Sequence, residues 1–134
     1  MSLSLHATVE HFPIAGTFTI SRGSKTTASV VTCRIGDGVH TGSGECVPYG
    51  RYGETIDTVL AGIAAIRHHI EAGLSRADLQ RAMKPGAARN AVDCALWDLE
   101  AKQKNKSAHV LAGISSPEAL TTAYTLPAFL HRKH

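Results

Sequence analysis

Two short segments carry the residues best suited to chemistry. Arg22 lies in a polar stretch, and Tyr49, Arg51 and Tyr52 lie in the sequence PYGRYG, between flexible residues. An arginine guanidinium can bind a carboxylate through two parallel hydrogen bonds, and aromatic rings can form the walls of a binding site. These residues could therefore bind a small acidic ligand. The alternative is that both segments are ordinary surface loops.

Other reaction chemistries have weaker support in the sequence. The eight histidines do not predict a metal site, because His68 and His69 point in different directions on a helix and no third ligand follows at a recognisable spacing. No GxSxG motif frames a serine, so nucleophilic catalysis has no motif. Cys94 lies in an alanine-rich helical stretch, where a buried and inert thiol is expected.

Composition and charge limit the classes of protein to consider. The chain has 134 residues, 43% of them hydrophobic and 19% charged, which is typical of one globular domain. A net charge of +3, with basic clusters only at residues 102–106 and 132–134, gives nucleic-acid binding no support. No signal peptide or run of 18 apolar residues occurs. Three cysteines without a CxxC spacing predict a reducing, cytoplasmic location.

The first loop candidate lies between two predicted strands. Apolar and polar residues alternate over residues 3–9, which predicts a half-buried strand. Pro13 and Gly16 interrupt this pattern, and Phe18 and Ile20 precede a polar tip over residues 21–25. We therefore expect an exposed loop there.

A hairpin is expected before the second loop candidate. Val and Thr are frequent over residues 27–35, a GDG turn follows, and residues 39–46 are again extended. Gly42 and Gly44 begin a GxGxxG pattern, but Val47 stands at the third glycine position. We predict that these glycines allow a close backbone approach or a bulge.

Helices are expected in the second half of the chain, which makes the fold class α+β. Ile and Val recur at helical spacing in the first of them, and Ser75 can cap the second. The predicted helices cover residues 56–70, 75–83, 85–102 and 109–112, and a strand is predicted over residues 120–126.

The helix over residues 85–102 reads PGAARNAVDCALWDLEAK. Small and apolar residues share one face of this helix, which allows another backbone to approach closely. Asp98 precedes Lys102 by four residues, and Glu100 precedes Lys104 in the same way. This is the favourable order for ion pairs on a helix.

This helix motif, RYGET and TTAYTL together resemble the amino-terminal capping region of the enolase superfamily. The resemblance is to the muconate-lactonizing-enzyme-like branch, and within it to dipeptide epimerases of the L-Ala-D/L-Glu type. It implies an antiparallel three-stranded sheet followed by a helical bundle over residues 1–118. Residues 119–126 would be the first strand of an otherwise absent TIM barrel, and residues 127–134 an aberrant tail.

The resemblance also implies a substrate site. Two loops of the cap, at residues 17–25 and 48–53, would close over the substrate. Arg22 stands where dipeptide epimerases have an arginine that can hold a substrate carboxylate, and Thr125 stands at the end of the first barrel strand. The expected substrate-binding residues are Arg22, Ile20, Tyr49, Arg51, Tyr52 and Thr125.

The family's chemistry lies in the barrel, where lysines exchange an α-proton and acidic residues hold Mg²⁺. None of these positions is expected in this chain, so we expect no catalytic residue and no metal ligand here. The expected partners are the barrel domain and a dipeptide or N-acyl amino acid, and self-association is possible. Because the sequence PAFLHRKH departs from the family pattern, we expect a truncated, frameshifted or mispredicted reading frame. Because the barrel is expected to be absent, we also expect part of the small-residue surface of the helix over residues 85–102 to be bare.

Two alternatives remain open from the sequence. The chain could be the cap of another muconate-lactonizing-type enzyme, namely a cycloisomerase, an o-succinylbenzoate synthase or an N-acylamino acid racemase. It could also be an interaction module without catalytic function.

Overall fold

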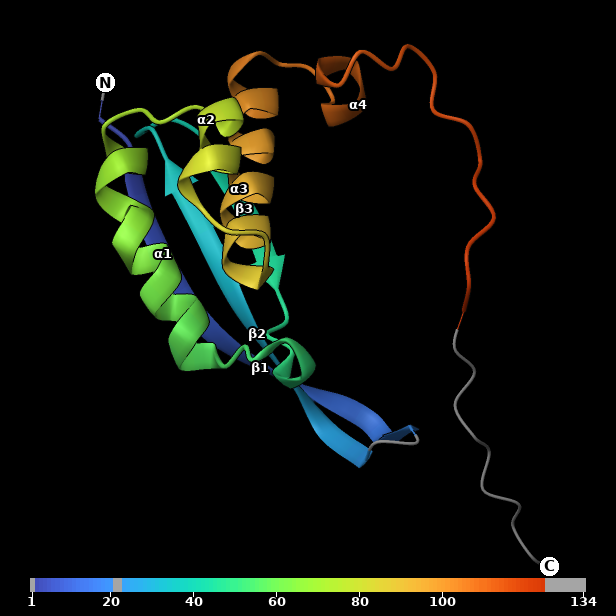
Figure 1. The fold of residues 1–134 in the computed structure, drawn as a ribbon. Coiled ribbons are helices and arrows are strands. Elements are labelled where there is room, and N and C mark those ends of the chain that lie inside the picture. The colour runs from blue at the N-terminus through green and yellow to red at the C-terminus, as the bar shows by residue number, and fades with distance from the viewer. Residues whose placement is uncertain (1, 21–22, 125–134) are drawn as a thin grey trace, which may run out of the picture.

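A three-stranded sheet precedes the helices along the chain (Figure 1). The structure is a computed structural model and describes residues 2–20 and 23–124. Its elements are β1 (Ser4–Ile20), β2 (Gly23–Gly36), β3 (Thr41–Cys46), the short 3-10 helix η1 (Gly50–Tyr52), α1 (Ile56–Glu71), α2 (Arg76–Ala82), α3 (Ala87–Gln103) and α4 (Ala108–Leu111). The predicted α+β class and the predicted order of a three-stranded sheet followed by helices are confirmed.

The sheet is antiparallel throughout, with β2 between β1 and β3. In one row across it, Ala7 lies beside Cys33 and Cys33 beside Gly44. Residues of this row and of every second row from it point toward α1 and α3, which cover one face of the sheet. The buried core is formed by Leu5, Val31, Cys33, Ile35, Cys46, Val59, Ile63, Ile66, Ile70, Leu79, Ala91, Val92, Ala95, Leu96 and Leu99.

The segment predicted as a loop over residues 17–25 is mostly strand. β1 and β2 continue beyond the sheet as a two-stranded ribbon, in which Phe18 pairs with Lys25 and Ile20 with Gly23. Pro13 does not end β1, because β1 is an edge strand and a proline there need not donate to a neighbour. A shift of register between Pro13 and Phe18 accommodates Gly16, whose φ is +86°.

Gly42 and Gly44 pack against α3, as the predicted close approach requires. A Cβ atom at Gly42 would overlap the carbonyl oxygen of Ala95, and one at Gly44 would overlap that of Ala91. The small-residue face of α3 is therefore covered by β3. The expectation that part of this surface lies bare is wrong for Ala91 and Ala95, which are both 0% exposed.

The charged face of α3 forms the ion pairs expected from the sequence. Lys102 Nζ lies 2.8 Å from Asp98 Oδ2, and Lys104 Nζ lies 2.6 Å from Glu100 Oε1. Asp98 also accepts a hydrogen bond from the backbone N–H of Ser43 at 2.8 Å. This bond ties β3 to α3 from the polar side of the helix.

The strand predicted over residues 120–126 is not formed in its described part. Residues 117–124 have no regular structure, and the side chains of Leu120 and Tyr124 are 89% and 83% exposed. A strand needs a neighbouring strand for its backbone hydrogen bonds, and the described sheet contains only β1, β2 and β3. The assignment of residues 119–126 to a barrel stays a prediction, and residues 125–134 lie outside the described part.

No helix in the described part of the chain combines the length and apolar character needed to cross a membrane.

Candidate functional site

A groove of about 860 Å³ lies between the end of the β1–β2 ribbon and the turn that follows β3. Two segments distant in sequence thus meet, as the two predicted loops require. In Figure 1 the ribbon extends from the sheet near η1. The lining residues are Phe18, Gly23, Ser24, Lys25, Val47, Pro48, Tyr49, Gly50 and Arg51.

Residues 49–53 form a tight turn with a 3-10 helix at its centre. The carbonyl of Tyr49 accepts hydrogen bonds from the N–H groups of Tyr52, at 3.0 Å, and Glu54, at 3.3 Å. Gly53 has φ +73°, a left-handed conformation that residues with a side chain rarely adopt. The rings of Tyr49 and Tyr52 lie 5.4 Å apart between centroids and are tilted by 59°. The turn therefore carries two neighbouring aromatic rings, and Arg51 lies between them in the sequence.

Glu54 connects this turn to the start of α3. Its Oε2 atom accepts a hydrogen bond of 2.7 Å from the backbone N–H of Ala87. The RYGET segment and the start of the α3 motif, both of which carried the resemblance, are thus in direct contact. Glu54 was not predicted as a site residue, because its partner lies 33 positions further along the chain.

The structure locates some of the predicted substrate-binding residues. Tyr49 and Arg51 line the groove, and Tyr52 packs beside Tyr49 with 75% of its surface exposed. Ile20 lies at the end of the ribbon, where its backbone pairs with Gly23. Arg22 and Thr125 lie outside the described residues, so their binding roles stay predictions.

Phe18 and Lys25 line the groove but were not predicted to do so. They are direct partners across the ribbon, so the pairing of β1 with β2 brings a ring and a cation together. A prediction of a β-hairpin over residues 13–27 would have placed Phe18 opposite Lys25. With Arg51 on the opposite side, two cations and several apolar groups line the groove. Such a lining suits a small ligand that carries a carboxylate.

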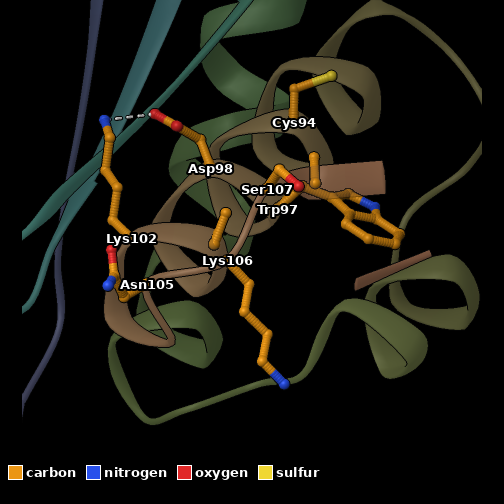
Figure 2. A pocket seen from close by; sticks show the side chains of 9 residues that line it. Cys94, Trp97, Asp98, Lys102, Asn105, Lys106 and Ser107 are labelled. Atoms are coloured by element: carbon orange, nitrogen blue, oxygen red, sulfur yellow. Dashed lines mark hydrogen bonds and ion pairs between the residues drawn. The ribbon is translucent and has the colours of Figure 1, made fainter. Parts of the chain in front are cut away.

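A second hollow, of about 600 Å³, lies on the outer side of α3 (Figure 2). Trp97, Asp98 and Lys102 line it together with residues 105–108. Cys94 also lines this hollow and is exposed, so the prediction of a buried thiol was wrong. The reason is the orientation of α3 about its axis. Ala91 and Ala95 face the sheet, and the side chain of Cys94 lies outside that face of the helix.

The described residues do not provide a metal site. Among them, no three His, Cys, Asp or Glu side chains come close enough together to hold a metal ion. The acidic groups near the groove and α3 are instead used in hydrogen bonds to backbone and basic groups, as for Glu54 and Asp98.

Residues 4–113 match the family model of the mandelate racemase / muconate lactonizing enzyme N-terminal domain. The chain is 44% identical over 117 residues to the L-Ala-D/L-Glu epimerase of Escherichia coli (strain K12), covering 87% of this chain and 36% of that protein. It is 40% identical over 96 residues to an N-acetyl-D-glutamate racemase of Pseudoalteromonas sp, covering 69% of this chain and 30% of that protein. The chain thus spans about a third of the length of these relatives.

Solved structures agree with these sequence matches. One is an enolase family member from Agrobacterium tumefaciens with homology to dipeptide epimerases, solved with bound sodium and L-Ala-L-Glu. It is 61% identical to this chain with a TM-score of 0.80, and the match covers 83% of this chain and 34% of that one. A dipeptide epimerase from Enterococcus faecalis V583, complexed with Mg and L-Leu-L-Tyr, is 25% identical with a TM-score of 0.70 at the same coverage. The family match covers residues 4–113, and the sheet and helices of the chain align with those of the solved relatives. The chain therefore belongs to the mandelate racemase / muconate lactonizing enzyme family of the enolase superfamily, as an N-terminal domain related to those of dipeptide epimerases.

Proposed function

We propose that this chain is the substrate-specificity cap of a dipeptide epimerase. The observation that carries the proposal is the groove in which the ribbon, through Phe18 and Lys25, faces the turn that carries Tyr49 and Arg51. The cations would hold a substrate carboxylate, and the rings would cover its apolar part. In the proposal, Arg22 and Thr125 also bind the substrate.

The proposed substrate carries a glutamate residue. The relatives are an L-Ala-D/L-Glu epimerase and an N-acetyl-D-glutamate racemase, and the structure at 61% identity holds L-Ala-L-Glu. The substrates in these names share a glutamyl group with a side-chain carboxylate. Lys25 and Arg51 provide positive charge of the kind that recognises this group.

The proposed role is binding and orientation of the substrate, and not the proton transfer itself. Racemisation at an α-carbon needs a base on each face and a means of stabilising the enolate. In the proposal, a catalytic barrel domain supplies the lysines and the Mg²⁺ site, and the chain alone is inactive. The three free thiols are compatible with the proposed cytoplasmic location.

A chimera tests this proposal. Residues 1–118 would replace the corresponding cap of the Escherichia coli relative, whose barrel would be kept. We expect the chimera to incorporate deuterium from heavy water at the α-carbon of L-Ala-L-Glu, and the isolated 134-residue chain to incorporate none. Exchange by the isolated chain, or a folded chimera without exchange, would contradict the proposal. The relative's barrel without a cap is the matched control.

A second candidate is the cap of an N-acylamino acid racemase, which the 40% identity to the N-acetyl-D-glutamate racemase favours. The same chimera separates the two candidates when it is given L-Ala-L-Glu and N-acetyl-L-glutamate in parallel. A higher kcat/KM for the dipeptide supports the epimerase, and a higher value for the N-acetyl compound supports the racemase.

A further inference from the structure

Helix α3 begins without a cap from its own sequence. Its N-cap residue is Gly86, which has no side chain, and its first turn contains no acidic residue. The first N–H groups of any helix have no partner within the helix. Here Glu54 supplies an acceptor from another part of the chain, at 2.7 Å from the Ala87 nitrogen.

The position of Gly86 is compatible with this remote cap. Its φ of +155° lies at the edge of the left-handed region, and a Cβ atom there would be 3.3 Å from Glu54 Oε2. Glycine therefore leaves room for the carboxylate. A negative charge at the start of a helix is also favoured by the helix dipole. The contact thus combines a charge-assisted hydrogen bond with a favourable electrostatic position.

The same residue closes the turn that lines the groove. The backbone N–H of Glu54 donates to the carbonyl of Tyr49 at 3.3 Å. The next residue, Thr55, caps α1 by exchanging hydrogen bonds with Thr58. Residue 54 is therefore held between the turn, the start of α1 and the start of α3.

We propose that Glu54 is a positioning residue that fixes the turn of residues 49–53 to α3. Through this contact it sets where Tyr49 and Arg51 stand in the groove, and so the affinity for the ligand. The anchoring follows from the structure alone, while its effect on a substrate rests on the proposed function. Glu54 is not among the residues that line the groove itself, so its effect is exerted through the turn.

Amide hydrogen exchange in the 134-residue chain tests the anchoring directly. Glu54→Ala should speed exchange at the N–H groups of Ala87, Tyr52 and Gly53 by about tenfold or more, since a charge-assisted bond is lost. The N–H of Ile63 in the middle of α1 should keep its rate. Asp57→Asn, an exposed acidic position in the first turn of α1, is the matched control and should change none of these rates.

Ala87→Pro tests the same contact from its other end. Proline lacks the N–H donor but is well tolerated at the first position of a helix, so α3 should remain. We expect faster exchange at Tyr52 and Gly53, although the substitution lies on a different element. Unchanged exchange at these two residues would overturn the proposal. If Glu54→Ala does not fold, Ala87→Pro, which removes the donor and keeps Glu54, decides the test by itself.

The consequence for a substrate is tested in the chimera. Glu54→Ala, which removes the acceptor, should raise KM for L-Ala-L-Glu by about tenfold while kcat changes less than about twofold, because the contact serves binding rather than the transition state. Ala87→Pro should do the same, and the double variant should be no worse than either. A loss of folded enzyme alone would lower kcat and leave KM unchanged, which would overturn the positioning role. An inactive unmutated chimera would contradict the proposed function, while the exchange rates would still decide the anchoring.

Discussion

Gly44 lies directly against the backbone carbonyl of Ala91, so closely that no side chain fits between them. Gly42 stands in the same relation to Ala95, one turn further along α3. The strand β3 and the helix α3 are therefore in contact backbone to backbone. This contact holds the sheet to the helix whose start is bonded to Glu54.

Gly44→Ala should destabilise the fold strongly. The added methyl group must push β3 and α3 apart, and overpacking of this kind typically costs about 1–3 kcal/mol, or more when the neighbour is backbone. Urea unfolding followed by circular dichroism measures the loss. Gly50→Ala is the matched control, because nothing lies within 4 Å of a Cβ atom there. Equal midpoints for Gly44→Ala and the parent would contradict the close approach.

The two glycines also show how far sequence reasoning reaches. Their spacing and the lack of a third glycine correctly predicted a close backbone approach. The partner could not be predicted, because Ala91 lies 47 positions after Gly44 and only the tertiary fold brings them together. For the same reason part of the small-residue face of α3 was expected to be bare, although β3 covers Ala91 and Ala95.

The candidate site shows the same difference between features visible in a short segment of sequence and contacts between residues that are far apart in the sequence. Residue types drew attention to Tyr49 and Arg51, which line the groove, and their role in substrate binding stays a prediction. Phe18 and Lys25 were missed because Pro13 and Gly16 were interpreted as the end of the strand, whereas pairing with β2 carries β1 past them. Glu54 was missed because capping at a distance leaves no local pattern.

Asp37 should make the fold sensitive to acid. Its carboxylate accepts hydrogen bonds from the N–H groups of His40, at 2.7 Å, and Val39, at 2.8 Å, and from Gln103 Nε2 at 2.8 Å. These bonds, that from His40 first, hold the pKa of Asp37 well below its usual range. Since the folded pKa is lower than the unfolded one, the stabilisation is present above about pH 4 and is lost as the pH falls below it.

Asp37→Asn tests this because asparagine carries no charge. Its single side-chain oxygen can still accept the two backbone bonds that Asp37 Oδ1 accepts, while its NH2 group cannot accept the bond from Gln103. At pH 7 the variant should unfold at a lower urea concentration than the parent, and the difference should shrink steadily between about pH 4 and pH 2. The exposed Glu118→Gln is the control and should follow the parent curve. A difference that stays constant with pH would show that the charge of Asp37 does not contribute.

The three thiols should differ sharply in reactivity. Burial, together with the nearby Cys46, raises the pKa of Cys33 to about 12, and burial with the charge of Glu54 raises that of Cys46 to about 11. Cys94 is exposed, although partial burial and then Asp93 raise its pKa as well. We expect one thiol of the native chain to react with a disulfide reagent at pH 8, and all three in denaturant.

Cys94→Ser should remove the native reaction, while Cys33→Ser should leave it unchanged. The thiolate is the reactive form, and the pKa of Cys94 is raised. The labelling rate of Cys94 should therefore still increase at pH values where the rate of a free cysteine has levelled off. Fast labelling that persists in Cys94→Ser would place a reactive thiol elsewhere and contradict the burial of Cys33 and Cys46.

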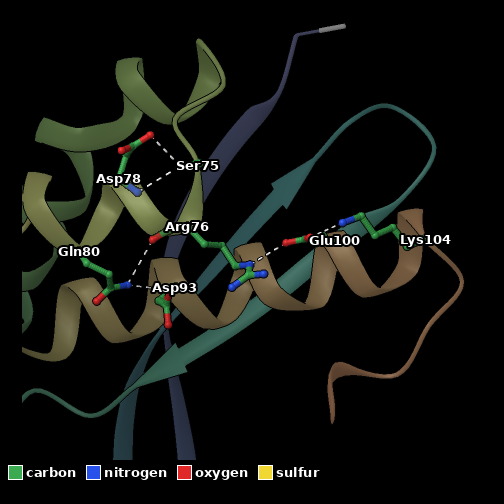
Figure 3. Close-up of polar contacts among 7 residues, drawn as sticks. All are labelled: Ser75, Arg76, Asp78, Gln80, Asp93, Glu100 and Lys104. Carbon is green, nitrogen blue, oxygen red and sulfur yellow. Dashed lines mark hydrogen bonds and ion pairs between the residues drawn. The ribbon is translucent and has the colours of Figure 1, made fainter. Parts of the chain in front are cut away.

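Arg76 joins α2 to α3 through two contacts that should both be measurable. Figure 3 shows the contact with Glu100. Its guanidinium carbon lies 3.4 Å from the centroid of the Trp97 ring, and its Nε atom lies 2.6 Å from Glu100 Oε2. Glu100 also pairs with Lys104, and these bonds, that from Arg76 first, lower its pKa. The partly buried guanidinium therefore stacks on a ring and pairs with a carboxylate at the same time.

Arg76→Ala should lower the free energy of unfolding by about 1–2 kcal/mol, since a cation–π contact and an ion pair are lost together. Trp97 is the single tryptophan of the chain, so its emission should shift to longer wavelength as water reaches the uncovered ring. Arg76→Lys should restore little of either, because an ammonium group cannot stack flat on the ring while it pairs with Glu100. Arg81→Ala, on the same helix but with a side chain 79% exposed, is the control and should change stability by less than about 0.5 kcal/mol. Equal effects at Arg76 and Arg81 would mean that the contact on Trp97 adds nothing beyond a surface charge.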